Sequence, residues 1–454
     1  TVSMAHLGAR AFEEIGGEVV QTTSFVRVRT HIDNYKGVYC RLIEPTTQQG
    51  KEEMFLAGEN RYTANQDNFA KIPGGSIAYW ASNQALQWFE GAQIGDCALL
   101  CQGLTTTDNE KYVREWFEPS FIRIGFGLSL ESAQESSKRW FPFNKGGGFC
   151  KWYGNNDLVV NYENNGVEIK ADVLRKYPYL KTPDFVVKNS RTYFKEGLTW
   201  SALSNTFSIR WFPQGAICAD KGQGLFDDEQ KLYYDCGLLN SKVSKMYLQL
   251  VSPTLDFNCG YVRKIPYVFD DSYNCRVSEI VKQSIALSRN DWDSFETSWD
   301  FKSHPFVRLR TAGGYAWGNN PPTMRIASAY KAWEIECDDR FAQLKANEEE
   351  LNRIFIDIYG LQDELTPEVE DKDVTVRKAD LGRDARSFIS YAVGCMFGRY
   401  SPTYDGLAYA GGTWDDGKYN IYKPDADGII PICDDEYFED DMMGRFVEFV
   451  RVVY

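Results

Sequence analysis

Short apolar runs of strand length follow one another through the first two thirds of the chain, separated by polar and glycine-containing turns. Runs rich in β-branched and aromatic residues between such turns predict strands. The predicted strands cover residues 4–7, 19–28, 120–128, 158–162, 207–211 and 216–220. A polar loop from Pro45 to Gly50 predicts a boundary, so we expect residues 1–48 to form part of a sheet and residues 49–285 a mixed α/β domain.

Apolar positions change to helical spacing further along the chain, which predicts helices with one buried face. The first such set is Leu238, Leu239, Val243, Met246, Tyr247 and Leu250. A second stripe consists of Phe341, Leu344, Leu351, Ile354, Phe355 and Ile358. Residues 290–365 and 387–397 are therefore predicted to be helical, and residues 286–454 to form a mainly helical domain. Both stripes indicate core packing rather than a binding site.

Length and composition place the chain among globular proteins with several domains. It has 454 residues, of which 43% are hydrophobic and 15% aromatic, enough for about three domains with sizeable cores. No apolar run is long enough for a membrane span, and no secretion signal is present in the sequence. Eleven cysteines without a C-x-x-C pair and three scattered histidines predict reduced thiols and no zinc site. We expect a cytoplasmic protein.

Negative charge is unevenly distributed along the sequence. The formal net charge is −14, yet residues 286–454 hold 19 Lys and Arg against 32 Asp and Glu. Residues 1–285 are therefore close to neutral and can carry a basic face, which a domain that binds a polyanion needs. The acidic third is better suited to binding protein or to keeping the molecule in solution.

The segment RWFPFNKGGGFCKWYGNN (residues 139–156) combines cations, flat aromatic rings, amides and glycines. Glycines let backbone N–H groups approach an anion, and Arg and Lys supply the charge that a phosphate attracts. Aromatic rings can stack on bases, and amides can pair with base edges. These properties favour a nucleic-acid contact loop. The alternative is a glycine hairpin whose aromatic side chains pack inward.

Several long phrases of the sequence resemble one known family. They are the segment above, QGLTTTDNEKYVREW (102–116), YFKEGLTWS (193–201), DWDSFETSWDF (291–301) and NEEELNRIFIDIYGLQDEL (347–365). The chain resembles the C-terminal portion of PglX proteins, the adenine-specific DNA methyltransferases of BREX phage-exclusion systems. Residues 237–268 are also similar to target-recognition domains of type I specificity subunits.

The resemblance implies an α+β architecture in three parts. Residues 1–48 would be the end of a methyltransferase sheet, residues 49–285 a DNA target-recognition domain, and residues 286–454 the helical acidic domain. S-adenosylmethionine is the implied cofactor of the full-length family enzyme, and its site is expected upstream of residue 1. No catalytic, cofactor or metal residue is predicted in this chain.

Three motifs that imitate enzyme sites fail on their residue types. Asn320-Pro321-Pro322-Thr323 lacks the aromatic ring that would stack on a flipped adenine. Gly222-Gln223-Gly224 is followed by Asp227, where a dinucleotide loop needs a third glycine. The phosphate-loop imitation at residues 412–418 is followed by Tyr419 instead of a hydroxyl residue that would hold magnesium.

Double-stranded DNA is the predicted partner, with contacts from three segments of the recognition domain. The predicted DNA-binding residues are Gln102, Thr105, Thr106, Asn109, Arg139, Asn144, Lys145, Gly146, Gly147, Lys151, Trp152, Asn155 and Lys195. One alternative function is a protein-interaction scaffold that binds other BREX components through the acidic domain. A second is a carbohydrate-binding module, suggested by the abundant Trp, Tyr, Asn and Asp and disfavoured by the lack of secretion signals.

Overall fold

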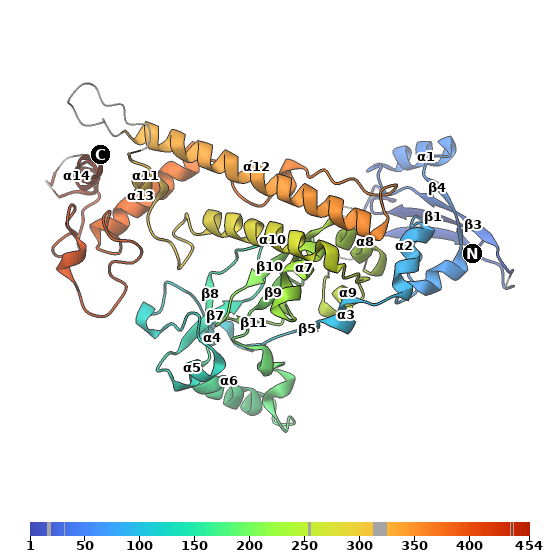
Figure 1. Ribbon diagram of the computed structural model, residues 1–454, viewed down its shortest axis with the longest axis horizontal. Helices are drawn as coiled ribbons and strands as arrows, with labels where there is room; N and C mark the ends of the chain where they lie inside the picture. Colours follow the sequence, from blue (N-terminus) through green and yellow to red (C-terminus); the bar gives the residue numbers. More distant parts are fainter. Residues whose placement is uncertain (16–19, 31, 253–255, 312–324, 436, 439) are drawn as a thin grey trace.

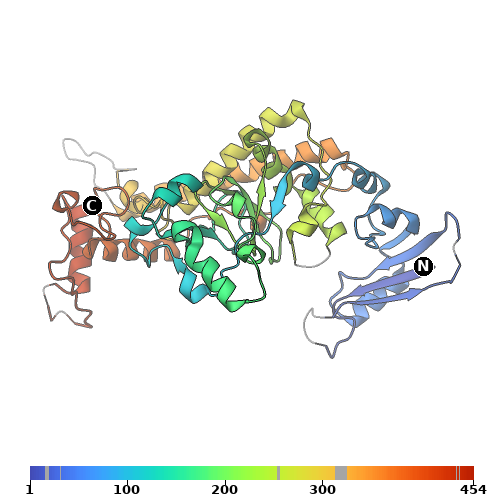
Figure 2. The same ribbon diagram turned by 90° about the horizontal axis from the view of Figure 1, so that it is seen from below.

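The computed structural model is elongated, with a small sheet at the N-terminal end and a group of helices at the C-terminal end (Figures 1 and 2). The structure describes residues 1–15, 20–30, 32–252, 256–311, 325–435, 437–438 and 440–454. Small sheets and long helices are combined in one chain, which agrees with the predicted α+β class. Each helix within these residues is too short or too polar to cross a lipid bilayer.

The first sheet has the strand order β2-β1-β3-β4, in which β1 and β3 are parallel. Its strands are β1 (Ser3–Gly8), β2 (Thr22–Val26), β3 (Lys36–Arg41) and β4 (Arg61–Asn65). β1 and β2 confirm the predicted strands at residues 4–7 and in the described part of 19–28. The sheet extends beyond residue 48, because β4 pairs with β3. The polar loop near residue 48 begins a helix, α1 (Gln48–Ala57), whose N-terminus is capped by the Thr47 side chain.

Two further four-stranded sheets form the centre of the molecule. One has the order β10-β9-β12-β5 and is antiparallel throughout. The other has the order β11-β7-β8-β6, with β11 and β7 parallel. Their strands are β5 (Leu99–Cys101), β6 (Val113–Glu115), β7 (Trp140–Asn144), β8 (Leu158–Asn161), β9 (Gly197–Ser201), β10 (Ile209–Phe212), β11 (Ile217–Cys218) and β12 (Gly222–Phe226). The predicted strands at 158–162, 207–211 and 216–220 match β8, β10 and β11.

The strand predicted at residues 120–128 is wrong. This stretch contains the 3-10 turn η3 (Phe121–Arg123) and an isolated bridge at Ile124. Its aromatic side chains pack in one small cluster: Phe121 and Phe126 contact each other, and Phe126 also contacts Trp299. Packing against residues distant in sequence therefore outweighs the β propensity of the run.

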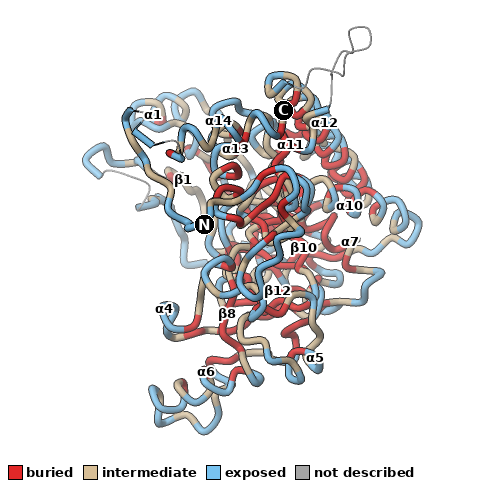
Figure 3. Tube along the Cα trace, turned by 90° about the vertical axis from the view of Figure 1, so that its left-hand side faces the viewer, coloured by how far each residue is buried: buried red, intermediate tan, exposed pale blue. Residues whose placement is uncertain are grey.

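Helices α7 (Glu229–Asn240), α8 (Lys242–Val251), α10 (Asp271–Trp292) and α12 (Ile326–Tyr359) cover the β10-β9-β12-β5 sheet and form the main core with it. The helix predicted from the 238–250 stripe is divided in two at Ser241, whose side chain accepts a hydrogen bond from the Ser244 N–H and donates one to the Leu238 carbonyl. Figure 3 shows the buried chain concentrated around α7, α10, β10 and β12.

A second core lies at the C-terminal end. It is formed by α11 (Pro305–Arg308), α13 (Leu381–Met396), α14 (Met442–Val453) and the first turns of α12, including Trp333. α13 confirms the predicted helix at 387–397, whereas α14 lies in the tail for which no helix was predicted. Because α12 contributes side chains to both cores, it connects the centre of the molecule to this end (Figure 1).

The remaining helices are short. They are η1 (Gln66–Lys71), α2 (Asn83–Gln87), η2 (Trp88–Glu90), α3 (Ile94–Cys97), α4 (Asn109–Tyr112), α5 (Leu130–Glu135), α6 (Glu163–Lys176), η4 (Pro183–Phe185), η5 (Ser190–Thr192), α9 (Cys259–Val262), η6 (Asp371–Asp373) and η7 (Asp416–Lys418). Among them α6 is the longest, and it lies on the side of the molecule opposite α12 (Figure 1).

Truncation of the buried face of α12 should destabilise the main core. Leu344 is fully buried, so Leu344→Ala is expected to lower the free energy of unfolding by about 2–5 kcal/mol, as the loss of buried methyl groups leaves a cavity. Ile335→Ala on the same helix is the control, since Ile335 is 55% exposed and should change stability by less than about 0.5 kcal/mol. Urea unfolding followed by circular dichroism measures both. Equal midpoints for the two variants would contradict the burial of this face.

Candidate nucleic-acid interface

Residues 139–156, called the glycine segment below, contain β7 and most of the connection from β7 to β8. β7 and β8 are antiparallel, with Trp140 opposite Asn161 and Phe141 opposite Val160. Gly146 and Gly147 have φ values of 103° and 128°, which glycine adopts without strain. The Gly146 N–H donates to the Asn144 side chain at 3.1 Å, and Ser201 donates to the Gly147 carbonyl at 2.9 Å. The first half of the segment is therefore a turn fixed against β9.

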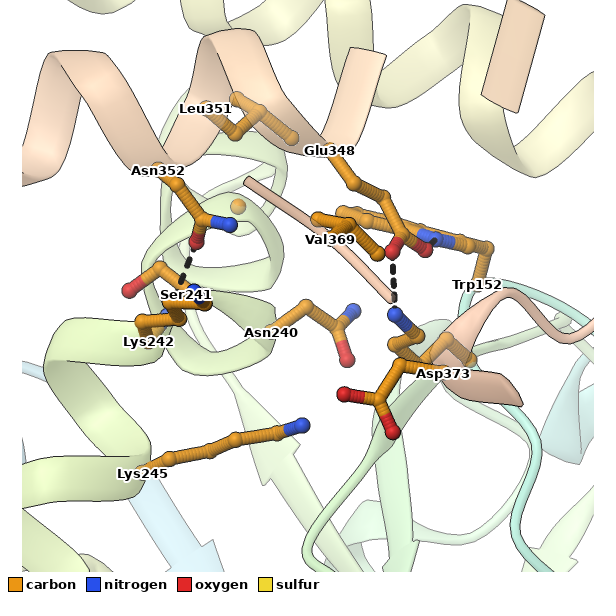
Figure 4. Close-up of a pocket in the computed structure, with 12 residues that line it drawn as sticks. Trp152, Asn240, Ser241, Lys242, Lys245, Glu348, Leu351, Asn352, Val369 and Asp373 are labelled. Carbon is orange, nitrogen blue, oxygen red and sulfur yellow. Dashed lines mark hydrogen bonds and ion pairs between the residues drawn. The ribbon is translucent and has the colours of Figure 1, made fainter. Parts of the chain in front are cut away.

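The second half of the segment runs into the interior. The Trp152 N–H donates to the Ile209 carbonyl at 3.0 Å, and the Trp152 carbonyl accepts from Trp211 at 2.7 Å, so this residue pairs with the edge strand β10. Its indole N–H donates to Glu348 of α12 at 2.8 Å. The other carboxylate oxygen of Glu348 forms an ion pair with Lys151. Figure 4 shows Glu348 reaching down from α12 toward Trp152.

Several of the predicted DNA-binding residues are buried in this structure. Lys151 and Trp152 are 3% and 1% exposed, and both are bound to Glu348. Their cationic and aromatic groups join the glycine segment to α12 instead of facing outward. Asn144, Gly146 and Thr106 are also buried. The alternative of a hairpin with inward-packed aromatic groups describes this half of the segment.

Other members of the glycine segment lie at the surface. Gly147 is exposed, and Lys145 and Asn155 are half-buried. The Asn155 amide donates to the Gly148 carbonyl at 2.9 Å and so stabilises the turn. Arg139, at the start of the segment, has a side chain that is 41% exposed. These residues stay predictions as DNA contacts.

A small polar pocket lies beside Glu348 and is too small for a nucleotide. It has a volume of about 20 Å³, room for a water-sized group. Lys242, Lys245 and Asp373 line it (Figure 4). Burial lowers the pKa of Lys245, and the neighbouring Lys151 lowers it further. The pocket thus belongs to the contact between α8, α12 and the glycine segment.

The loop Gln102–Asn109 packs against residues 170–195. The Lys188 ammonium donates to the Gln102 side chain at 3.0 Å, and the Asn189 amide donates to the Gln102 carbonyl at 2.8 Å. Lys176, at the end of α6, donates to the Thr107 carbonyl at 3.0 Å. The Thr105 N–H donates to the Val186 carbonyl at 3.1 Å. The structure thus brings Gln102, Thr105 and Asn109 next to a segment that carries Lys195.

This segment is the most basic part of the central domain. Residues 170–195 contain seven Lys and Arg and only two Asp. Its exposed cations are Arg175, Lys176, Lys181, Arg191 and Lys195. These five residues, together with the adjacent loop Gln102–Asn109, are called the basic surface below. Tyr179 and Phe185 are 77% and 70% exposed, so large aromatic rings lie among the cations. Cations with exposed rings are the combination that binds nucleic-acid backbones and bases.

Charge in the basic surface is only partly neutralised within the chain. Hydrogen bonds from Lys111 and Tyr112 lower the pKa of Asp172, and hydrogen bonds with Asp172 and Glu168 raise the pKa of Lys111. Asp172 also pairs with Arg175 at 2.5 Å. No ion pair within the described residues involves Lys181, Arg191 or Lys195. Lys181, Arg191 and Lys195 therefore stay available to a polyanion.

The residues predicted from the sequence include Lys195 of this surface but not Arg175, Lys176, Lys181 or Arg191. A signal was present, because this short segment is strongly basic in a chain of net charge −14. The signal was overlooked because charge was summed over all of residues 1–285, which are close to neutral as a whole.

The Gly222-Gln223-Gly224 string forms part of a strand and not a loop. Gly222 and Gly224 lie inside β12, where an added Cβ would meet the Asn144 carbonyl oxygen at 2.3 Å and the Phe226 ring at 2.7 Å. These glycines therefore permit close packing of β12 against its neighbours. The string Asn320–Thr323 lies outside the described residues. No group of His, Cys, Asp and Glu side chains that could hold a metal ion occurs in the part of the chain that the structure describes.

Comparison with known proteins gives two strong matches over the whole chain. The adenine-specific methyltransferase PglX of Lacticaseibacillus casei (strain Zhang) is 43% identical over 465 residues, and the adenine-specific methyltransferase BrxX of Escherichia coli O9:H4 (strain HS) is 33% identical over 483 residues. The chain is homologous to the C-terminal portion of PglX. It spans 38% and 37% of the lengths of these relatives. No family model matches the sequence.

Removal of the Lys151 ammonium should leave the Glu348 carboxylate buried without its cation. Lys151→Ala is therefore expected to lower the free energy of unfolding by about 3–5 kcal/mol, the usual effect of breaking a buried ion pair on one side. Lys195→Ala, at an exposed site, is the control and should change stability by less than about 0.5 kcal/mol. Chemical denaturation compares them. A Lys151→Ala protein as stable as the control would contradict a buried pair.

Proposed function

We propose that this chain recognises duplex DNA for a site-specific adenine-N6 methyltransferase that marks host DNA in phage defence. Two relatives matched over the whole chain are named adenine-specific methyltransferases, which supports a DNA substrate. In this proposal, residues 49–285 bind the duplex. Methyl transfer from S-adenosylmethionine is carried out by residues corresponding to the part of the relatives outside the match.

The basic surface is the observation that carries the proposal. It combines five exposed cations with two exposed aromatic rings and lies on the side of the molecule opposite α12 (Figure 1). Phosphate contacts from Lys and Arg position a protein on DNA, while amides and rings near them reach the bases. Lys181 and Lys195 are assigned to phosphates. Asn109 is assigned to a base edge, because it is exposed and its side chain is held by a hydrogen bond of 2.6 Å from Thr106.

A second function, binding another protein of the defence system, is favoured by the C-terminal tail. Ile429 and Ile432 are 69% and 84% exposed in a region of negative net charge. Large exposed apolar side chains are typical of protein interfaces. The two functions are compatible, because the tail and the basic surface lie in different parts of the molecule (Figure 1).

Neutralising two cations of the basic surface should weaken duplex binding on all DNA sequences alike. For Lys181→Gln/Lys195→Gln, the slope of log K against log salt is expected to become shallower by about two, because each phosphate contact contributes about 0.9. Fluorescence anisotropy with a labelled duplex at several salt concentrations measures the slope.

The matched control is Lys331→Gln/Lys372→Gln, which removes two exposed cations from the acidic third. It should leave the slope unchanged. If both double variants lower the slope equally, the effect is one of net charge and the basic surface is not the contact. Absence of duplex binding by the unmodified chain would reject the proposed function.

A further inference from the structure

A separate pocket lies near the opposite end of α6 from the loop Gln102–Asn109. It has a volume of about 320 Å³. Its lining comes from β6, the connection from β6 to η3, the turn η3 and the start of β7. The lining residues are Arg114, Glu118, Pro119, Ser120, Arg123, Arg139 and Trp140. Three guanidinium groups and one indole thus line the pocket, with a single carboxylate among the lining side chains.

Two of the arginines are placed by the indole. The guanidinium carbons of Arg114 and Arg139 lie 5.6 and 5.7 Å from the centre of the Trp140 ring. At this distance a guanidinium is attracted to the ring, which holds it without using its N–H donors. Arg114 is further fixed because one of its nitrogens donates to the carbonyls of Glu110 and Val113. The charges of the pocket are therefore preorganised.

Arg123 and Arg139 have donors that the protein does not use. Their ion pairs with Glu163 are long, at 3.7 and 4.0 Å, and the pair of Arg139 with Glu168 is 3.8 Å. Good hydrogen bonds of this kind are about 2.7–2.9 Å long. Neither guanidinium forms a side-chain hydrogen bond to another described residue. The Nε of Arg139 is also buried without a hydrogen-bond partner among the described residues.

We propose that this pocket binds a phosphate group, and specifically a phosphodiester of the DNA backbone. Planar guanidinium groups match phosphate oxygens in pairs, and the hydroxyl of Ser120 supplies another donor beside them. Glu118 and Glu163 reduce the positive charge, which favours the single charge of a diester over the double charge of a free phosphate ester. This identification of the ligand rests on the proposed function, whereas phosphate binding itself does not.

Helix α6 connects the pocket with the basic surface. Glu163 at its start lies beside Arg123 and Arg139, and Lys176 at its end contacts the loop that contains Gln102. Its helical part spans on the order of 15 Å, which is roughly four base pairs of duplex. A duplex that lies along α6 would reach both sites, so the pocket would fix one backbone position while the basic surface contacts others.

The test compares two pairs of arginines. Arg123→Gln/Arg139→Gln removes two of the three guanidinium charges of the pocket, the two that lie beside Glu163. The matched control is Arg276→Gln/Arg353→Gln, since these two exposed arginines of α10 and α12 also share one carboxylate, that of Glu350. Anisotropy with a labelled duplex should show at least tenfold weaker binding at low salt for the pocket variant. Its salt slope should be shallower by one to about two, and the control should match the unmodified chain.

Titration calorimetry with inorganic phosphate and with a mononucleotide gives the second arm. For a backbone site, both compounds should bind at least a hundredfold more weakly than the duplex. A mononucleotide that binds more tightly than the duplex, and is lost in the pocket variant alone, would overturn the DNA assignment and identify a free nucleotide as the ligand.

The outcomes separate this inference from the proposed function. Normal duplex affinity and slope in the pocket variant, together with reduced values for Lys181→Gln/Lys195→Gln, would overturn the pocket and leave DNA recognition standing. If the unmodified chain binds no duplex, the backbone assignment falls together with the proposed function. Phosphate binding that depends on Arg123 and Arg139 would then still support an anion site, and its absence would reject that as well.

Discussion

The carboxylate of Glu348 is bound from two sides by the glycine segment, and the positions of the central elements depend on this buried contact. One oxygen accepts the Trp152 indole N–H and the other pairs with the Lys151 ammonium, while the Trp152 backbone pairs with β10. A buried charge without its partner is expensive, so few other arrangements of these elements are tolerated. The contact therefore specifies how α12, the glycine segment and the edge of the β10-β9-β12-β5 sheet fit together.

Buried carboxylates have the same role further along the chain. Asp291 of α10 accepts hydrogen bonds from Arg340 of α12 at 3.1 Å and from Arg377 at 2.9 Å. Asp384 of α13 accepts the Trp333 indole N–H at 3.0 Å. Part of the negative charge of residues 286–454 is thus internal and structural. The composition of this third suggests a binding or solubilising surface, but several of its acids join helices instead.

Patterns of apolar residues predicted those helices and strands that are specified by residues close together in the sequence. The stripe from Phe341 to Ile358 is one face of α12, and the run of β-branched residues at 158–162 contains β8, because both signals lie in residues that are neighbours in sequence. The glycine segment could not be resolved this way. The partner that draws Lys151 and Trp152 inward is Glu348, about 200 residues further along the sequence. Residue types show that a cation and an indole are present, but not whether a distant carboxylate will bury them.

The arrangement of charge over the whole molecule favours one orientation toward a polyanion. The acidic third supplies α12 and the C-terminal helices, whereas the cations of residues 170–195 lie on the opposite side, around α6 (Figure 1). DNA is repelled by the first side and attracted by the second, so a chain with net charge −14 can still approach a duplex in a defined orientation. The acids of this segment do not cancel this asymmetry, because residues 170–195 hold seven Lys and Arg against two Asp. Net charge alone is therefore a poor guide to the ligand. The relevant property is the separation in space of the acidic third from the cations of residues 170–195.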